Sequence, residues 1–408
     1  MTESTRTYRW AERAMTTVAS AMPGSVKSNA IQLGGGYGFP DELPDIVAEA
    51  IAAATDRAEG LQYGPLYGLD DLRDEIVRYL QQDGVAATRD NILVVNGAKH
   101  GLDLACRVFL EKGDAVIVTA PTYLTAASIL KAAEATFMSI AQDESGIDTE
   151  ELEQKLAARK ASGDPIPKML FDVPDFHNPT GITTSVERRK RLVELAEQFG
   201  FIIIEDDPYR RIRFEGEPVP PIKSFDTTGC VIGLGTVSKI LAPGLRIGWV
   251  NASPEIVRRM AAHKSDHGTC PLLQRIVTQL FQNGKVDHHI ASLSKVLRGH
   301  RDAMVKAIHR HLPGATVRVP HGGYFLWVEL PEGVNADELV KRAAKAGVAI
   351  FSGTLSFAEA APTNFLRLAY SYSPPEKITR GVELVGKVYG QLLAEAGLAA
   401  APSTHRVA

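Results

Sequence analysis

The sequence predicts an α/β fold, in which a large domain with a mostly parallel sheet covered by helices on both faces is joined to a smaller α+β domain. Short continuous apolar segments alternate with amphipathic segments of helical period, which is the pattern of parallel strands connected by helices. The chain has 408 residues, of which 45% are hydrophobic and 23% are charged, so it can bury a large core.

The large domain is expected at residues 41–285, where strand-like and helix-like segments follow one another in regular order. Its predicted strands lie at residues 91–98, 115–121, 135–141, 167–175, 201–207 and 230–235. The helices predicted between them lie at residues 99–111, 122–133, 148–161 and 185–199.

The smaller domain is expected at residues 286–408, together with an N-terminal segment, residues 1–40. A long helical stretch, residues 256–312, leaves the large domain. Between residues 315 and 371 the pattern alternates between strand, helix and strand, which indicates an α+β arrangement. The last residues, 398–408, are expected to fray.

The composition excludes several classes of protein. The net charge of −3 gives no basic surface for nucleic acid, and no window of about 18 uninterrupted apolar residues predicts a membrane span. The first residues lack the apolar core of a secretion signal, and the three cysteines have no metal-ligand spacing. We therefore expect a cytoplasmic protein with reduced thiols and with no metal, membrane or nucleic-acid partner.

Chemically informative residues follow the predicted strands, where ligands bind in an open parallel sheet. Gly97, Ala98 and Lys99 open a helix, so their amides can hold an anion, although an ordinary strand-to-helix turn also needs a glycine. Asp206, with Tyr209 three residues later, can face a protonated heterocycle or can cap the turn before a proline. Each motif alone is weak evidence for a site.

Lys239 stands among apolar and glycine residues in "GTVSKILAPGLRIGWV", and Arg246 follows seven residues later. A lysine kept partly away from water can be a neutral, nucleophilic amine, whereas a lone lysine is usually a solvated surface residue. "HNPTG", residues 177–181, is a turn in which Asn178 offers an amide to a ligand.

The ordered set is much more specific than its parts. A turn that can hold an anion, then N-P-T-G, then D-x-x-Y, then S-K-x-x-x-P-G-L-R-x-G occur in this order, each at a predicted strand end. This set resembles the fold-type I, aspartate-aminotransferase-like enzymes (class I/II) that use pyridoxal 5′-phosphate. The resemblance covers the chain from "IQLGGGYGFP" to "NFLRLAYS", and is nearest to the kynurenine and 2-aminoadipate aminotransferases, which also resemble the C-terminal domain of MocR-type regulators.

The resemblance implies catalytic roles for Lys239, Asp206 and Tyr209, and a binding role for Asn178. Lys239 matches the lysine that forms a Schiff base with the cofactor, and whose released amine moves the substrate's Cα proton. Asp206 matches the carboxylate that pairs with the ring nitrogen and keeps it protonated. Tyr209 and Asn178 match residues that hydrogen-bond the phenolic oxygen of the ring, and Asn178 also matches a contact to the substrate carboxylate.

The resemblance also implies how the cofactor is held. Its phosphate is expected to contact a set of donors, namely the amides of Gly97, Ala98 and Lys99, the hydroxyls of Thr236 and Ser238, and the guanidinium of Arg246. Tyr123 matches an aromatic residue that stacks on the ring. Tyr63 matches a tyrosine that reaches the phosphate of the neighbouring subunit, which implies a homodimer with shared active sites.

Substrate contacts are implied at two places. Arg367 lies in an apolar strand, where a charge is costly without a partner, and matches the arginine that binds the substrate α-carboxylate. Residues 34–40, including Gly36, match a mobile segment that closes over the substrate, although a simple glycine turn has the same sequence.

The sequence departs from the family pattern in three places. Ala98 and Lys99 replace the usual serine and glutamine, so one phosphate contact is lost, and Lys99 either replaces it or points toward the substrate. Residues 210–213 are unusually basic, and at least two of Arg210, Arg211 and Arg213 are expected to face solvent. His177, beside the expected cofactor, is a packing candidate.

The function that the resemblance implies is transfer of the amino group of an L-amino acid to a 2-oxo acid. The same cofactor site also serves β-elimination, decarboxylation and oxygen-dependent oxidative deamination, so these reactions stay open as alternatives. A third alternative, the sensor module of a transcriptional regulator, is disfavoured because the fold-type I pattern begins by about residue 30 with no basic recognition helix before it.

Overall fold

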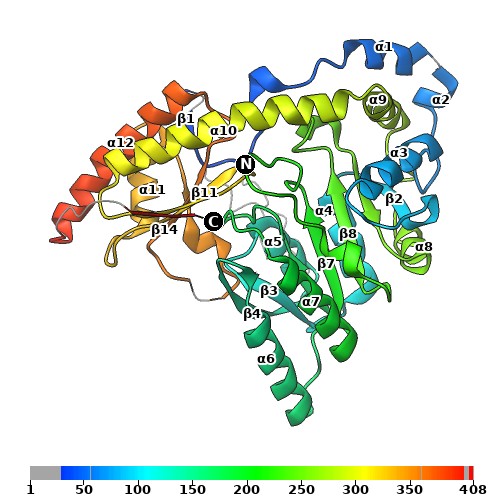
Figure 1. Ribbon diagram of the computed structural model, residues 1–408, viewed down its shortest axis with the longest axis horizontal. Coiled ribbons are helices and arrows are strands. Elements are labelled where there is room, and N and C mark those ends of the chain that lie inside the picture. The colour runs from blue at the N-terminus through cyan, green and yellow to red at the C-terminus, as the bar shows by residue number, and fades with distance from the viewer. Residues whose placement is uncertain (1–28, 56, 360, 399–403, 408) are drawn as a thin grey trace, which may run out of the picture.

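The computed structural model describes residues 29–55, 57–359, 361–398 and 404–407 of the chain. Two sheets dominate it, and the long helix α10, Lys285–His311, runs across both parts of the molecule (Figure 1). The first 28 residues of the predicted N-terminal arm lie outside the described residues. None of the described helices is long and apolar enough to cross a bilayer.

The larger sheet has eight strands in the order β2-β9-β8-β7-β6-β3-β4-β5. Strands β8, β7, β6, β3 and β4 are parallel, whereas β9 is antiparallel to both its neighbours and β5 is antiparallel to β4. The strands are β2 Ile92–Val95, β3 Ala115–Ala120, β4 Thr136–Asp143, β5 Gly146–Ile147, β6 Met169–Asp172, β7 Ile202–Asp207, β8 Val231–Thr236 and β9 Gly248–Asn251. The prediction of a mostly parallel sheet is confirmed.

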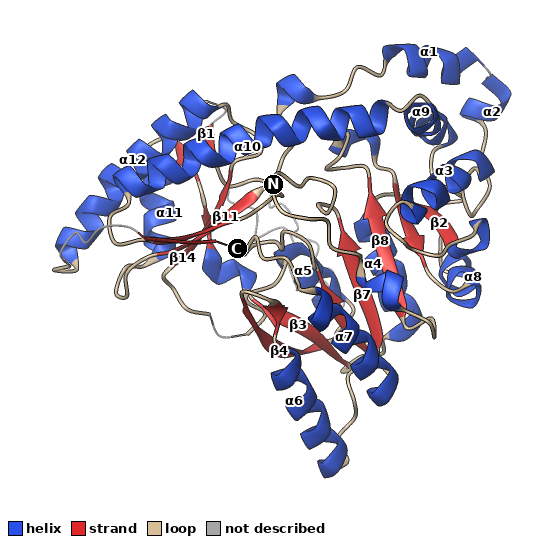
Figure 2. Cartoon of the chain, in the orientation of Figure 1, coloured by secondary structure: helices blue, strands red, loops and turns tan. Residues whose placement is uncertain are grey.

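Helices cover both faces of this sheet, as predicted (Figure 2). Successive side chains of a strand point to opposite faces, and in β7 Ile203 packs with Leu192 of α7, whereas Ile204 belongs to the core cluster that includes Leu102 of α4. The covering helices are α4 Ala98–Phe109, α5 Leu124–Ala132, α6 Thr149–Ser162 and α7 Val186–Phe199. Each strand is therefore fixed from two sides.

Two of these helices begin and end on residues whose chemistry fixes the boundary. The side chain of Asp148 accepts hydrogen bonds from the backbone N–H groups of residues 150 and 151 at the start of α6, and Gly163, at φ +78°, ends that helix. Ser185 caps α7 in the same way, and Gly200, at φ +79°, ends it. These caps set where the following strands β6 and β7 begin.

The smaller sheet has five strands in the order β13-β14-β11-β10-β15. Separately, β1 pairs in parallel with β12, so the N-terminal segment joins the C-terminal part of the chain, as predicted. The elements of this part are β1 Ile31–Gln32, β10 Thr316–Val319, β11 Phe325–Glu329, α11 Ala336–Lys345, β12 Val348–Ala349, β13 Phe351–Ser352, β14 Phe365–Ala369, α12 Pro375–Glu395 and β15 Thr404–Val407. The expectation of a frayed end is wrong for residues 404–407, because β15 pairs with β10.

The predicted helical stretch at 256–312 is interrupted. It comprises α8 Pro254–Ala262, α9 Pro271–Gln282 and α10, separated by a loop before Pro271 and by Gly284 at φ +67°. Three earlier helices precede the sheet, namely α1 Val47–Thr55, α2 Arg57–Leu61 and α3 Asp70–Gln81, and all three contact α9. The domain boundary predicted at residue 285 coincides with the first residue of α10 and stays a prediction.

Candidate active site

A cavity of about 750 Å³ lies where the strand ends of the larger sheet face the C-terminal part of the chain. Its walls combine residues that are far apart in the sequence. The predicted site residues that line it are Gly36, Ala98, Lys99, Tyr123, Asn178, Asp206, Tyr209, Thr236, Ser238, Lys239, Arg246 and Arg367. The structure thus brings twelve of the predicted residues together around one space.

Lys239 lies in the turn after β8, with its amine in the cavity. Its Nζ donates a 2.7 Å hydrogen bond to the carbonyl oxygen of Gly36, and its own carbonyl oxygen accepts one of 2.8 Å from the hydroxyl of Tyr324. Burial, together with the positive charges of Lys99 and Arg367, lowers the pKa of the Lys239 amine to about 8. The amine is therefore closer to its neutral form than an ordinary lysine.

Three consecutive carboxylates, residues 205–207, end β7 on alternating faces of the sheet. Glu205 accepts hydrogen bonds from the backbone N–H groups of residues 222 and 223, and Asp207 pairs with Arg210 at 2.6 Å. Asp206 differs, because its buried Oδ1 has no hydrogen-bond partner among the described residues. Burial raises the pKa of Asp206 to about 7. A carboxylate in this state fits a ligand that brings an N–H donor.

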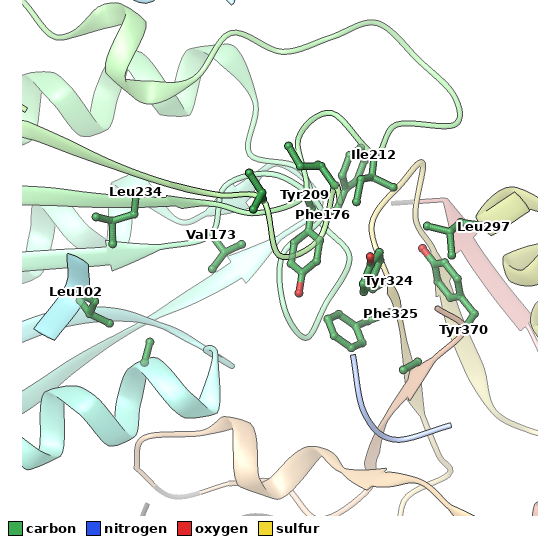
Figure 3. Packing of buried hydrophobic residues seen from close by; sticks show 14 of the residues in the cluster. Leu102, Val173, Phe176, Tyr209, Ile212, Leu234, Leu297, Tyr324, Phe325 and Tyr370 are labelled. Atoms are coloured by element: carbon green, nitrogen blue, oxygen red, sulfur yellow. The ribbon is translucent and has the colours of Figure 1, made fainter. Parts of the chain in front are cut away.

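Two tyrosines stand on either side of the cavity. Tyr209 is buried, with its ring centroid 5.4 Å from that of Tyr324 and 6.0 Å from that of Phe325, and burial raises the pKa of its phenol well above the ordinary value. Figure 3 shows these three rings where loops from the larger sheet meet the smaller one. Tyr123 precedes α5, and the Nζ of Lys99 lies 5.7 Å from its ring centroid.

The end of β2 and the turn after β8 form a cluster of hydrogen-bond donors, which we call the anion cup: residues 97–99, Thr236, Ser238 and Arg246. Gly97, at φ +83°, precedes α4, whose first backbone N–H groups have no partner within the helix. The Oγ1 of Thr236 donates to the Oγ of Ser238 at 2.9 Å, and Nη1 of Arg246 lies 3.4 Å from the same hydroxyl. Hydroxyls, amides and a guanidinium together suit a phosphate.

Arg367 is buried in β14 and faces the cavity from the smaller sheet. Its Nη1 donates to Oδ1 of Asn178 at 3.1 Å, and its Nη2 donates to the carbonyl oxygen of Gly34 at 2.7 Å. The rings of Phe325 and Phe351 lie 4.5 and 4.2 Å from its guanidinium carbon. Burial lowers the pKa of Arg367 to about 10, and its Nε has no partner among the described residues, so an anionic ligand would complete its environment.

Sequence reasoning missed the two phenylalanines that hold Arg367. Phe325 is the first residue of β11, and Phe351 begins β13, so both flank β14 in the smaller sheet. In the sequence each is one apolar residue among others in a strand, and only the register of the sheet, which pairs Phe351 with Arg367, places it there.

Two of the predicted residues, Tyr63 and Gly97, do not line the cavity within a single chain. Gly97 lies against the guanidinium of Arg246, which does line it. The side chain of Tyr63 is 81% exposed, and its ring centroid lies 5.8 Å from that of His267. Its role toward a neighbouring subunit stays a prediction.

The expectation that at least two of Arg210, Arg211 and Arg213 face solvent is wrong. Arg210 is buried and pairs with Asp207 and, at 2.6 Å, with Asp83, and Arg211 also pairs with Asp83 at 2.7 Å. Arg213 lies 3.5 Å from a carboxylate oxygen of Asp175 and is also partly buried. Asp207 is a local partner, whereas Asp83 and Asp175 come from distant segments, so the local sequence gives no sign of them.

His177 is a buried residue behind the cavity. Its two ring nitrogens lie 3.0 Å from the hydroxyls of Thr119 and Thr180, and burial lowers its pKa to about 3. These contacts are those of a neutral packing residue. Across the described residues, no group of three or more His, Cys, Asp or Glu side chains is placed to hold a metal ion.

The site fits the cofactor that the sequence resemblance implies. The unpartnered carboxylate of Asp206 suits a ring N–H, the amine of Lys239 suits an aldehyde, and the anion cup suits a phosphate. All three groups line one cavity, whose walls also include the ring of Tyr123. The fit to the cofactor rests on the presence of all these groups in one cavity rather than on any single residue.

Comparison with known proteins gives consistent results. Residues 30–385 match the family model of aminotransferase class I and II. The chain is 38% identical over 363 residues to aromatic-amino-acid aminotransferase 1 of Thermococcus litoralis, with 87% of each chain covered. The crystal structure of multiple substrate aminotransferase from Thermococcus profundus is similar at a TM-score of 0.89 and 37% identity, covering 95% of this chain and 98% of that one.

A third similar protein was solved with a cofactor derivative. It is the alpha-aminoadipate aminotransferase from Thermus thermophilus, complexed with N-(5′-phosphopyridoxyl)-L-leucine. The TM-score is 0.83 at 30% identity, over 93% of this chain and 97% of that one. The family match, residues 30–385, includes all the residues that line the cavity.

Proposed function

Because the chain belongs to the class I and II aminotransferases, which use pyridoxal phosphate, we propose that it moves the amino group of an L-amino acid to a 2-oxo acid, with Lys239 as the residue that carries the cofactor. The protein is a transferase enzyme. The observation that supports the proposal best is the buried, unpartnered Oδ1 of Asp206 in the same cavity as the Lys239 amine.

When bound, pyridoxal 5′-phosphate supplies an aldehyde that bonds to an amine and a ring that takes up the electrons released when the Cα–H bond breaks. Asp206 would accept the N–H of that ring and keep it positively charged. Tyr209 and Asn178 would hydrogen-bond the ring oxygen, and Tyr123 would contact the ring. The anion cup would hold the phosphate, and Arg246 is the guanidinium that belongs to it.

Lys239 moves the proton in this proposal. Once released from the cofactor, its amine would take the proton from the substrate Cα and later give it up again, so one group would act first as base and then as acid. The lowered pKa of Lys239 supports this role, because an ordinary lysine would be fully protonated near neutral pH. Lys99 and Arg367 contribute the positive charges that favour the neutral amine.

Arg367 orients the substrate by binding its α-carboxylate with two parallel hydrogen bonds. The aromatic rings of Phe325 and Phe351 hold the guanidinium in place, so it loses little side-chain entropy when the substrate binds. Gly36 and its neighbours cover the amine from the other side. With the carboxylate fixed by Arg367 and the ring by Asp206, the Cα–H bond is directed at Lys239.

We also propose that the enzyme is a cytoplasmic homodimer. Several apolar side chains on and near α1 and α2 are exposed in the single chain, including Val47, Ile51 and Leu61. Tyr63 lies in the same region and is the residue expected to reach the phosphate of the neighbouring subunit. The free thiols of Cys106, Cys230 and Cys270 are consistent with a reducing compartment.

Borohydride reduction followed by peptide mapping tests the proposal. The vitamer is expected on the peptide that contains Lys239, and a label on another lysine, or a protein that never takes up the cofactor, would contradict it. Mixing the loaded enzyme with an L-amino acid should then release the matching 2-oxo acid in stoichiometric amount. Oxygen uptake, carbon dioxide or thiol release instead would indicate one of the other reactions of this cofactor.

A further inference from the structure

The anion cup is supported from behind by a second polar layer, which we call the brace: Asn96, Asp266 and Lys264. The brace lies outside the cavity, since none of its three residues lines it. Its members come from the end of β2 and from the loop between α8 and α9. It reaches the cavity through Arg246 and through the chain itself, since Asn96 directly precedes Gly97 of the anion cup.

Arg246 rests on the backbone of residues 96 and 97. Its Nη2 donates a 2.9 Å hydrogen bond to the carbonyl oxygen of Asn96, and a methyl group placed on Gly97 would lie 2.5 Å from the same nitrogen. Arg246 itself has a φ of +51°, a conformation that non-glycine residues rarely adopt. The Asn96 carbonyl thus holds Nη2 by the shortest hydrogen bond of the guanidinium, while Nη1 donates to the carbonyl oxygen of Pro243 at 3.3 Å and to the hydroxyl of Ser238 at 3.4 Å.

Asn96 is in turn held through its side-chain Nδ2 and its backbone N–H. Its side-chain Nδ2 donates to Oδ2 of Asp266 at 2.6 Å, and its backbone N–H donates to Nδ1 of His100 at 3.2 Å. Asp266 is itself anchored, because its Oδ1 accepts from the backbone N–H of Gly268 at 3.1 Å and lies 3.0 Å from Nζ of the buried Lys264. The carbonyl that Arg246 uses is therefore fixed from several directions.

We propose that Asn96 and Asp266 are positioning residues, which hold the Arg246 guanidinium where it grips the cofactor phosphate. This inference rests on the proposed function, because it needs a phosphate in the anion cup. Without the brace, Asn96 can turn its carbonyl away, and Arg246 loses the acceptor that fixes Nη2. Binding of the phosphate then has to order the mobile Arg246 side chain, and the entropy cost of this ordering weakens cofactor binding.

The test compares two vitamers that differ only in the phosphate. Asn96→Ala removes the side-chain bond to Asp266 and leaves the backbone carbonyl in place. Fluorescence titration of the cofactor-free protein is expected to show the Kd of pyridoxal 5′-phosphate rising by about tenfold, as for loss of one hydrogen bond to a charged group. The Kd of pyridoxal, which has no phosphate, should change by less than about twofold.

A matched control lies next to the other end of β2. Asn91→Ala also removes asparagine side-chain bonds, namely the 2.9 Å bond to the carbonyl oxygen of Ala252 and the two that its Oδ1 accepts from Thr88, but none of these bonds involves Arg246 or the brace. It should cost stability without altering the ratio of the two dissociation constants. In an Arg246→Ala background, Asn96→Ala should have no further effect on the Kd of pyridoxal 5′-phosphate.

The outcomes separate this inference from the proposed function. The positioning role would be overturned if Asn96→Ala raised the Kd of both vitamers equally. It would also be overturned if Asn96→Ala had its full effect on the Kd of pyridoxal 5′-phosphate in the Arg246→Ala background. Neither result would contradict the proposed function. Wild-type protein that binds neither vitamer would instead overturn the proposed function, and the inference with it.

Discussion

Replacing Lys239 by methionine should make the cofactor-free protein more stable near neutral pH. The amine is held in a cavity where burial and the charges of Lys99 and Arg367 disfavour its protonated form. In the unfolded chain the same amine is fully solvated and keeps its ordinary pKa of 10.5. Folding at pH 7 therefore forces a charged group into an unfavourable place, and methionine avoids this at nearly the same volume.

The size of the effect follows from the two pKa values. The difference between 10.5 and about 8 corresponds to an upper limit of about 3 kcal/mol, since each pKa unit is worth about 1.4 kcal/mol. The variant also loses the hydrogen bond from Nζ to the carbonyl oxygen of Gly36, and this loss lowers its free energy of unfolding by about 1 kcal/mol. We expect Lys239→Met to raise the free energy of unfolding by about 2 kcal/mol at pH 7.

The pH dependence has a definite sign. A lysine whose pKa is lowered by folding carries its full penalty below pH 8, where it is charged in both states. Between pH 8 and 10.5 the unfolded state binds more protons than the folded state, so the wild-type protein gains stability as the pH rises. The advantage of the methionine variant should therefore fall to near zero by about pH 10.

Urea unfolding of the cofactor-free proteins at pH 7, 8.5 and 10 measures this difference. Lys239→Arg is the control, because its guanidinium stays charged over the whole range and its difference from the methionine variant should stay constant. A methionine variant that is less stable than wild type at pH 7, or an advantage that does not shrink with rising pH, would refute the account of Lys239.

Three further predictions follow from the same site. Asp206→Asn should stabilise the cofactor-free protein by up to about 4 kcal/mol at pH 8 but not at pH 4. Burial raises the pKa of Asp206 from 3.8 to about 7, so the carboxyl costs stability only at a pH where it is ionised in the folded protein. Urea unfolding that shows the same advantage at both pH values would contradict this prediction. Arg367→Lys should raise the KM for the amino donor by about 30-fold with a smaller change in kcat, since the paired hydrogen bonds to the carboxylate are lost; steady-state kinetics showing a fall in kcat alone would count against the assignment. Gly97→Ala should lower the free energy of unfolding by more than about 1 kcal/mol and weaken cofactor binding, because the added methyl would lie 2.5 Å from Nη2 of Arg246. Gly113→Ala is the control, since Gly113 also has a positive φ but has open space around it. In thermal unfolding this control should show only the penalty of the backbone conformation.

The sequence was sufficient for most of the larger sheet and for the residues around its cavity. Continuous apolar runs such as residues 202–204 can only be strands buried on both faces, and polar residues that directly follow them meet at one edge of a parallel sheet. Asp206, Asn178 and Lys239 therefore come together as a consequence of topology, and the order of the motifs indicated which chemistry they serve.

Long-range pairing could not be predicted in the same way. Residues 210–213 look like a solvated basic loop because their acidic partners, Asp83 and Asp175, lie in other segments. Phe351 is placed against Arg367 by strand register, and register is set by the whole sheet rather than by either residue. The interruption of the helical stretch at 256–312 is a different case, because Gly268, at φ +103°, and Pro271, the first residue of α9, are local signals that the prediction of one helical stretch overlooked.

The cover over the Lys239 amine is built from main chain, and this limits how the enzyme can acquire new substrates. The carbonyl oxygen of Gly36 accepts the hydrogen bond from the Lys239 amine, and that of Gly34 accepts one from the neighbouring Arg367, so no exchange of side chains at these two positions can remove these contacts. An added methyl would meet Ile350 at 3.1 Å from Gly34 and Phe325 at 2.5 Å from Gly36. Point mutations can therefore make the site smaller on this side but not larger, and room for a bulkier amino acid has to be found at the opposite wall.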